Sequence, residues 1–278
     1  HLSMLPQDLA EAAYPDQAKY LVTLKNPLSR ELAVMRPGLL PGLLQTVARN
    51  VHHRNLNLRL FEFGRSYLSR EPERFQEEEY LALVASGESG PEHWLKGSYS
   101  ADIYEMKGWV KSLLDQAGIQ GLMWETTDAL PWTGHGVAVR TRKDGKLLTS
   151  LGWVSPDLTK MCGIKQMVYY AEVHWPLLKS LVPQGKVKLK PLPKFPAMRR
   201  DLALLVPQDM PFEKMEAVIK KQGGKQLESW QLFDVYQGKG VSEGFVSMAI
   251  GLVFRDANRT LRDEEAEKAT DRLLQALN

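Results

Sequence analysis

The sequence has little cysteine and no long apolar run, and each shortage excludes a class of protein. Cys162 is the single cysteine among 278 residues, which excludes an internal disulfide and favours a reducing compartment. No apolar run approaches the roughly 18–20 residues that a membrane span needs, and no signal-peptide pattern opens the chain. We therefore expect a cytoplasmic protein that does not enter a membrane.

The chain also has little net charge, and what it has is unevenly distributed. A formal net charge of +3 is too small to support nucleic-acid binding by the whole molecule. The first 185 residues are neutral, so the excess of Lys and Arg lies from residue 186 onward. Within it, Lys186–Arg200 holds six basic residues and no Asp or Glu. Such a segment can attract phosphates or act as a solvated linker, and composition alone favours the linker.

Prolines divide the chain into two parts. Pro176–Pro196 contains five prolines, which disfavour helix and interrupt sheet pairing, so it is predicted to connect two domains. A length of 278 residues with 44% apolar content also fits two domains better than one. The opening residues His1–Met4 do not resemble a natural start, and we expect the chain to be a piece of a longer protein.

The N-terminal part alternates helix-like and strand-like segments. Apolar residues at helical spacing predict helices over Leu39–Val51 and Ile103–Gln116. Alternating residues predict a strand over Leu58–Phe63, whose end Gly64 is expected to loosen. Further short strands are predicted over Tyr80–Ala85, Val137–Arg142, Lys146–Trp153 and Val168–Val173.

The C-terminal part has a clearer pattern, with the order β-α-β-β-α. Its three strands are predicted over Leu202–Val206, Leu227–Tyr236 and Phe245–Phe254. One helix is predicted to follow Asp209–Pro211, and a second to follow Thr260. This order is that of a ferredoxin-like, split βαβ fold without its last strand.

The predicted sheet of this part leaves one face open. Alternate residues of Phe245–Phe254 are bulky and form a core face, whereas those between them are mostly small. Asp234 and Tyr236 are placed beside the small residues, where a ring can stack on a base and a carboxylate can accept from guanine donors. In the alternative, Tyr236 caps the hairpin and Asp234 bonds to the glycine turn. The pattern fits both interpretations.

Several blocks of the sequence resemble the β chain of bacterial phenylalanine–tRNA ligase. They are Asn26–Ser29, Met35–Leu44, Leu60–Arg65, Lys194–Ala203, Leu232–Tyr236, Phe254–Asp256 and Arg259–Leu261. The blocks occur in collinear order over nearly the whole chain, and several are long enough to be highly specific.

The resemblance implies an α+β protein made of two modules. Residues 1–185 would form a catalytic-like but non-catalytic domain related to the class II synthetase fold, an antiparallel sheet flanked by helices. Residues 186–193 would be a linker, and residues 194–278 a ferredoxin-fold anticodon-binding domain. The family's final strand does not follow in this sequence, so we expect a three-stranded sheet with an unprotected edge.

The resemblance also implies partners and site residues. The family's enzyme is an (αβ)₂ heterotetramer that attaches phenylalanine to tRNA(Phe), and its α chain activates phenylalanine with ATP and Mg²⁺. Family members hold the first anticodon base on an Asp-x-Tyr of one strand and a serine of the next, which match Asp234, Tyr236 and Ser247. Arg199 and Arg200 are assigned to tRNA binding with them.

A missing motif limits the chemistry expected of this chain. No Gly-x-Gly-x-Gly-x-x-Arg run is present to clamp ATP, so nothing stabilises the transition state of adenylate formation. We therefore assign no catalytic residue, metal ligand or cofactor to the chain, and an independent ligase is disfavoured. The remaining alternative is a pure scaffold without anticodon discrimination, in which Leu40, Leu43, Leu44 and Val47 form a helical interface with the α chain.

Overall fold

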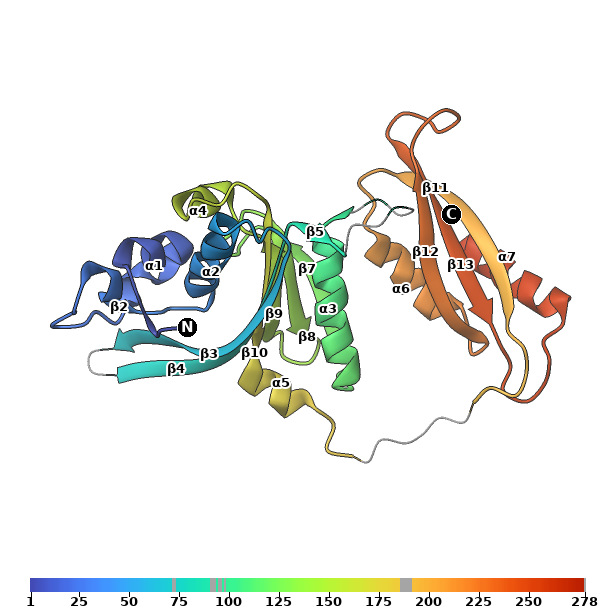
Figure 1. Cartoon of the computed structure of the whole chain (residues 1–278). Helices are drawn as coiled ribbons and strands as arrows, with labels where there is room; N and C mark the ends of the chain where they lie inside the picture. Colours follow the sequence, from blue (N-terminus) through green and yellow to red (C-terminus); the bar gives the residue numbers. More distant parts are fainter. Residues whose placement is uncertain (72–73, 91–93, 95–96, 98, 186–191, 278) are drawn as a thin grey trace. The chain divides into compact units, whose positions relative to one another are not determined.

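The computed structural model describes residues 1–71, 74–90, 94, 97, 99–185 and 192–277. The chain forms two compact units, His1–Gly185 and Lys186–Asn278, each with its own sheet and core (Figure 1). The basic residues Lys186, Lys188 and Lys190 of the predicted linker lie outside the described residues. None of the described helices is long and apolar enough to cross a membrane.

The N-terminal unit is built on a six-stranded antiparallel sheet with the order β3-β4-β10-β9-β8-β7. Its strands are β3 (Leu58–Glu71), β4 (Arg74–Ser86), β7 (Leu122–Thr127), β8 (Gly136–Thr141), β9 (Leu147–Trp153) and β10 (Val168–His174). Two small ribbons pair β1 (Met4–Leu5) with β2 (Val34–Met35), and β5 (Glu88–Ser89) with β6 (Tyr99–Ser100). The antiparallel sheet that was predicted for this unit is confirmed.

Helices cover both faces of this sheet and give the unit three layers (Figure 1). One face packs against α1 (Gln7–Ala13), α2 (Leu40–His52) and α4 (Pro156–Met161). The other packs against α3 (Ile103–Gln116) and α5 (Trp175–Leu181). Short 3₁₀ turns, η1 (Pro15–Tyr20) and η2 (Arg30–Leu32), connect the first elements. Both faces of the central strands are therefore apolar, as in Tyr170 and Ala171 of β10.

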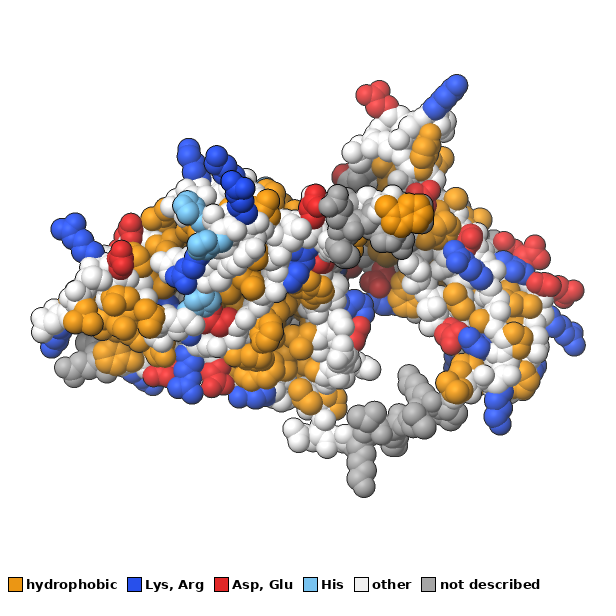
Figure 2. Space-filling model, viewed as in Figure 1, with side chains coloured by type: hydrophobic (Ala, Val, Ile, Leu, Met, Phe, Trp, Pro, Cys, Tyr) orange, Lys and Arg blue, Asp and Glu red, His pale blue; other side chains and the backbone are white. Residues whose placement is uncertain are grey.

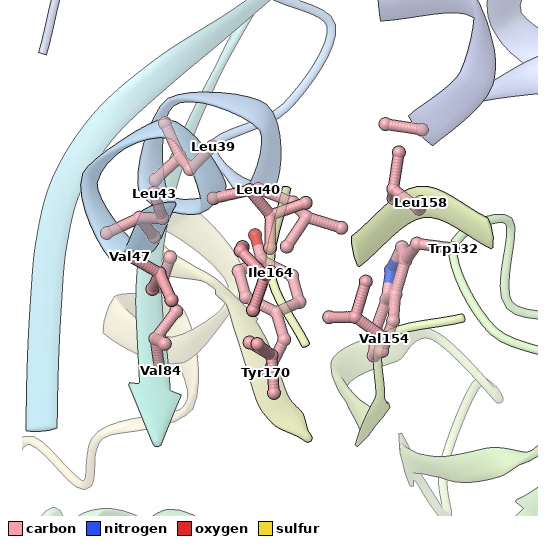
Figure 3. Packing of buried hydrophobic residues seen from close by; sticks show 14 of the residues in the cluster. Leu39, Leu40, Leu43, Val47, Val84, Trp132, Val154, Leu158, Ile164 and Tyr170 are labelled. Carbon is pink, nitrogen blue, oxygen red and sulfur yellow. The ribbon is translucent and has the colours of Figure 1, made fainter. Parts of the chain in front are cut away.

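Helix α2 belongs to the core, which argues against the alternative in which its apolar residues form a partner interface. Leu40 and Val47 have no exposed surface, and Leu43 is only 1% exposed. Figure 3 shows these side chains directed toward Val84 and Tyr170 of the sheet. Because they are enclosed within their own unit, they are not available to a partner chain.

The sequence predicted that this strand ends near Gly64, but β3 continues through Gly64 to Glu71. A side chain at Gly64 would overlap the guanidinium of Arg36, which lies across the strand at this point. Arg36 donates from Nη1 to Glu62 Oε1 (2.8 Å) and from Nε to the carbonyl oxygen of Arg65 (2.7 Å). Glycine is therefore needed here for space rather than to end the strand.

The C-terminal unit has a three-stranded antiparallel sheet with the order β11-β13-β12. Its elements are β11 (Met198–Pro207), α6 (Phe212–Gln222), β12 (Leu227–Tyr236), β13 (Phe245–Phe254) and α7 (Asp263–Leu277). The predicted order β-α-β-β-α is thus confirmed. Both helices pack on one face of the sheet, in a core that includes Ile219, Ile250 and Leu273.

Candidate nucleic-acid interface

No described element covers the second face of the C-terminal sheet. In β11, Leu202, Leu204 and Val206 are buried against the helices, whereas Ala203 and Leu205 between them are exposed. The same alternation continues along β13, the middle strand, except at Gly251, which is buried beneath Arg199. We call this second, uncovered face of β11, β13 and β12 the open face.

A β-bulge at Phe233 decides which residues of β12 reach the open face. Leu232 pairs with Ile250 of the core face, and Asp234 pairs with the preceding residue of β13, Ala249. Phe233 is therefore the extra residue, and the strand changes face as it passes it. Without the bulge, strict alternation would place Asp234 on the same face as Leu232.

The bulge brings three of the predicted RNA contacts together near the β12–β13 hairpin. Tyr236 lies directly opposite Ser247, and Asp234 lies opposite Ala249, the next open-face position along β13. Asp234 is exposed, and Ser247 is half-buried. Among the described residues, neither the carboxylate of Asp234 nor the hydroxyl of Ser247 has a hydrogen-bond partner. Both polar groups are therefore available to a ligand.

Tyr236 is fixed by the hairpin while its ring remains accessible. Its hydroxyl donates to the carbonyl oxygen of Lys239 (3.3 Å). Gly238 makes room for this contact, because a Cβ there would lie 2.7 Å from the tyrosine oxygen. The alternative interpretation, in which Tyr236 caps the hairpin, thus holds for its hydroxyl. The side chain is still 48% exposed, and a ring held in place is a preorganised stacking surface.

The two predicted arginine contacts lie on opposite faces of β11. Arg199 is on the open face, where its Nε donates to Asp201 (2.9 Å) and its guanidinium carbon lies 5.3 Å from the centre of the Phe233 ring. Arg200 is on the helix side and forms an ion pair with Asp263, at the start of α7. Because successive residues of a strand face opposite sides, Arg200 is separated from the other four residues.

The open face also contains residues that the sequence did not single out. Gln231 and Gly251 pair opposite each other and help to line a depression of about 260 Å³. Arg199, Ser229 and Val253 complete its lining on this face. One signal was available in the sequence, because a glycine inside a strand often marks the close approach of another group.

Acidic and basic side chains are interspersed over the C-terminal unit in the view of Figure 2. No field of a single sign therefore covers this visible surface. An RNA ligand of this unit would therefore have to be recognised by individually placed groups, such as Arg199 and Tyr236, more than by overall charge.

The N-terminal unit contains a buried group of titratable side chains. Tyr170 donates to Glu172 Oε2 at 2.8 Å, and Tyr14 donates to the same oxygen at 3.4 Å. Burial raises the pKa of Glu172, and burial together with the charge of Glu172 raises the pKa of both tyrosines. Shifted pKa values are frequent in active sites, but both tyrosines are buried among the apolar residues of the core. The group therefore supports packing rather than chemistry.

Comparisons with known protein families give a match for each unit. The model described as "Phenylalanyl tRNA synthetase beta chain CLM domain" matches residues 2–175. The model described as "Ferredoxin-fold anticodon binding domain" matches residues 193–278. Together they cover almost all of the chain.

Individual relatives agree with these matches. The phenylalanine–tRNA ligase beta subunit of Syntrophotalea carbinolica is 33% identical over 271 residues, which are 97% of this chain and 34% of the relative. The same subunit of Geobacter metallireducens is 34% identical over 95% of this chain and 33% of its own length. The chain thus spans about a third of the length of these relatives. Among solved structures, pyrrolysyl-tRNA synthetase from Desulfitobacterium hafniense aligns with a TM-score of 0.48 and 17% identity, covering 64% of this chain and 60% of that one.

Proposed function

The chain belongs to the family of phenylalanine–tRNA ligase β subunits, and we propose that its C-terminal unit binds the anticodon of tRNA(Phe) on the open face. Its N-terminal unit then contributes to assembly with a catalytic α chain in an (αβ)₂ enzyme. That enzyme attaches phenylalanine to tRNA(Phe) with ATP. The anticodon contacts are assigned to Asp234, Tyr236 and Ser247, with Arg199 beside them.

The shared position of Asp234, Tyr236 and Ser247 on the open face is the observation that carries this proposal. A carboxylate accepts hydrogen bonds from neighbouring N–H donors, which the edge of guanine presents, and an exposed ring stacks on the base. The hydroxyl of Ser247 can donate or accept beside them. Arg200 is left out of the site because Asp263 holds it on the other face.

ATP and Mg²⁺ belong to the α chain in this proposal. The described residues contain no group of three or more His, Cys, Asp or Glu side chains suited to a metal ion. Two arginines near β3 that might bind phosphate are already paired, Arg36 with Glu62 and Arg59 with Glu105. We assign no step of adenylation to the described part of this chain.

Replacing Tyr236 by Ala is expected to weaken binding of tRNA(Phe) by about 1–3 kcal/mol, because one base–aromatic stack is lost. The full chain is titrated with tRNA(Phe) and with a tRNA whose first anticodon base is changed, at two salt concentrations. The unaltered protein is expected to prefer the native anticodon, and the Tyr236→Ala variant to lose that preference.

Val235→Ala is the matched control for this measurement. Val235 is similarly exposed, at 52%, but it pairs with Met248 and so lies on the side of the sheet away from the open face. This variant is expected to bind both tRNAs like the unaltered protein. Unchanged affinity of Tyr236→Ala would remove Tyr236 from the site. Equal, steeply salt-dependent binding of both tRNAs would mean that only phosphates are contacted.

Exposed aromatic side chains on β3 support the assembly role of the N-terminal unit. Phe61 is 70% exposed, and Phe63 lies beside it with its ring packed edge-on against Trp175 at 4.7 Å. Adjacent exposed rings are typical of protein–protein contacts. Because the apolar residues of α2 are buried, we place the proposed contact with the α chain on Phe61 and Phe63 instead.

Replacing Phe61 by Ser is expected to weaken the complex with a cognate α chain by about 2 kcal/mol, roughly 30-fold, as for a central interface residue. The affinity is measured by titrating purified α chain into the full chain. Leu147→Ser, which changes an exposed apolar residue of β9, is the control and is expected to have no effect. Equal affinities of the two variants would place the contact elsewhere.

A further inference from the structure

We propose that the depression over Gly251 is a second nucleobase subsite, which takes another nucleotide of the same anticodon loop. The proposal rests on the proposed function, because it extends the RNA strand from the base held by Tyr236 along the open face. The depression is lined by Arg199, Ser229, Trp230, Gln231, Gly251 and Val253. The ring of Phe233 lies beside it, 5.3 Å from the guanidinium of Arg199.

Position 251 has no side chain, and the guanidinium of Arg199 takes the space above it. A Cβ at Gly251 would lie 3.1 Å from Arg199 Nη2, which is tighter than ordinary packing. The backbone does not require glycine there, because Gly251 is not among the residues with a positive φ. Glycine thus allows the guanidinium of Arg199 to lie across the middle strand, close to the sheet.

The flat groups of the depression favour a base over a phosphate. The guanidinium of Arg199 lies 5.3 Å from the ring of Phe233, so the bulge supplies an aromatic ring beside a planar cation. Nucleobases stack on both kinds of surface. Asp201 accepts from Arg199 Nε at 2.9 Å, which offsets the positive charge that a phosphate would require.

The polar groups at the edge suit the hydrogen-bonding edge of a base. Gln231 lies opposite Gly251, and its amide offers both a donor and an acceptor. Within the described residues, the side chains of Gln231 and Ser229 have no hydrogen-bond partner. The volume of about 260 Å³ is below the range of roughly 300–1,000 Å³ that is typical of ligand clefts, and it fits a small flat group.

The spacing of the two subsites requires an unstacked strand. Ser247, opposite Tyr236, and Gly251, opposite Gln231, are four residues apart on β13, about 13 Å at the rise of a strand. Stacked nucleotides of one strand rise only about 3.4 Å. The two bases are therefore splayed apart along the sheet, as in the single-stranded loops that such sheets bind.

The test combines protein variants with abasic RNA. The full chain is titrated with the anticodon stem-loop of tRNA(Phe), and with versions that lack one base at each loop position in turn. Gly251→Val displaces the guanidinium of Arg199 from the middle strand, and Gln231→Ala removes the amide at the edge without adding bulk. We expect each variant to bind the intact loop about 5- to 20-fold more weakly. One abasic loop should bind the unaltered protein as weakly as the variants bind the intact loop. Its affinity should not fall further when either variant replaces the unaltered protein.

The outcomes separate this subsite from the first one. Gln275→Ala, an exposed residue of α7, is the matched control and should leave all affinities unchanged. If removing each base in turn costs the Gln231→Ala variant as much affinity as it costs the unaltered protein, the second subsite is overturned. The preference for the first base is not affected by that outcome. If both variants lose the same affinity for all RNAs and show a weaker dependence on salt, the depression contacts a phosphate, and the second nucleobase subsite is also overturned. If no abasic loop binds differently from the intact loop, the proposed function itself fails.

Discussion

Replacing Arg36 by Ala is expected to lower the free energy of unfolding of the N-terminal unit by about 3–5 kcal/mol, as for a broken buried ion pair. Arg36 is 6% exposed, and it donates to the side chain of Glu62 and to the carbonyl oxygen of Arg65. Its removal leaves the largely buried Glu62 with His1 but without its arginine, and it opens a space over Gly64. Chemical denaturation of the full chain, followed by tryptophan fluorescence, measures the loss.

Arg65 offers the matched control for this prediction. Its side chain also pairs with a glutamate, Glu77 at 3.2 Å, but both partners are more than half exposed. Arg65→Ala is expected to change stability by only about 0–1 kcal/mol, because exposed ion pairs contribute little. If Arg36→Ala destabilises the unit no more than Arg65→Ala, the buried pair does not hold β3 against the segment that precedes α2.

Replacing Leu43 by Ala is expected to destabilise the N-terminal unit by about 2–5 kcal/mol, because it leaves a cavity in the core between α2 and the sheet. Gln45→Ala, at an exposed position of the same helix, is expected to change stability by less than about 0.5 kcal/mol. Both variants are compared by chemical denaturation and by titration with the α chain.

The same experiment decides between a core helix and a docking helix. A core role predicts a large loss of stability in Leu43→Ala and no specific loss of affinity once the protein is folded. If Leu43→Ala is as stable as Gln45→Ala but binds the α chain more weakly, α2 forms the interface of the scaffold alternative and not the packing shown in Figure 3.

Long segments with a clear period were predictable from the sequence. The helix over Ile103–Gln116 and the strands over Leu227–Tyr236 and Phe245–Phe254 have the expected bounds, because apolar spacing is a local property of each segment. The short elements β7, α4 and α5 were missed. α5 begins within the proline-containing segment that was predicted to be a connection, because proline is tolerated in the first turn of a helix. β3 was predicted too short, because Gly64 looks like a strand end until Arg36 is placed over it.

The sequence by itself determined the family, the order of elements in the C-terminal unit and the candidates Asp234, Tyr236 and Ser247. Only the tertiary structure decided which face each side chain occupies. Trp230, Leu232, Asp234 and Tyr236 have the same parity, so alternation alone would have put all four on one face. The pairing with β13 places the bulge at Phe233, which turns Asp234 and Tyr236 to the open face. A bulge arises from the register between two strands distant in sequence, and that information is absent from either strand alone.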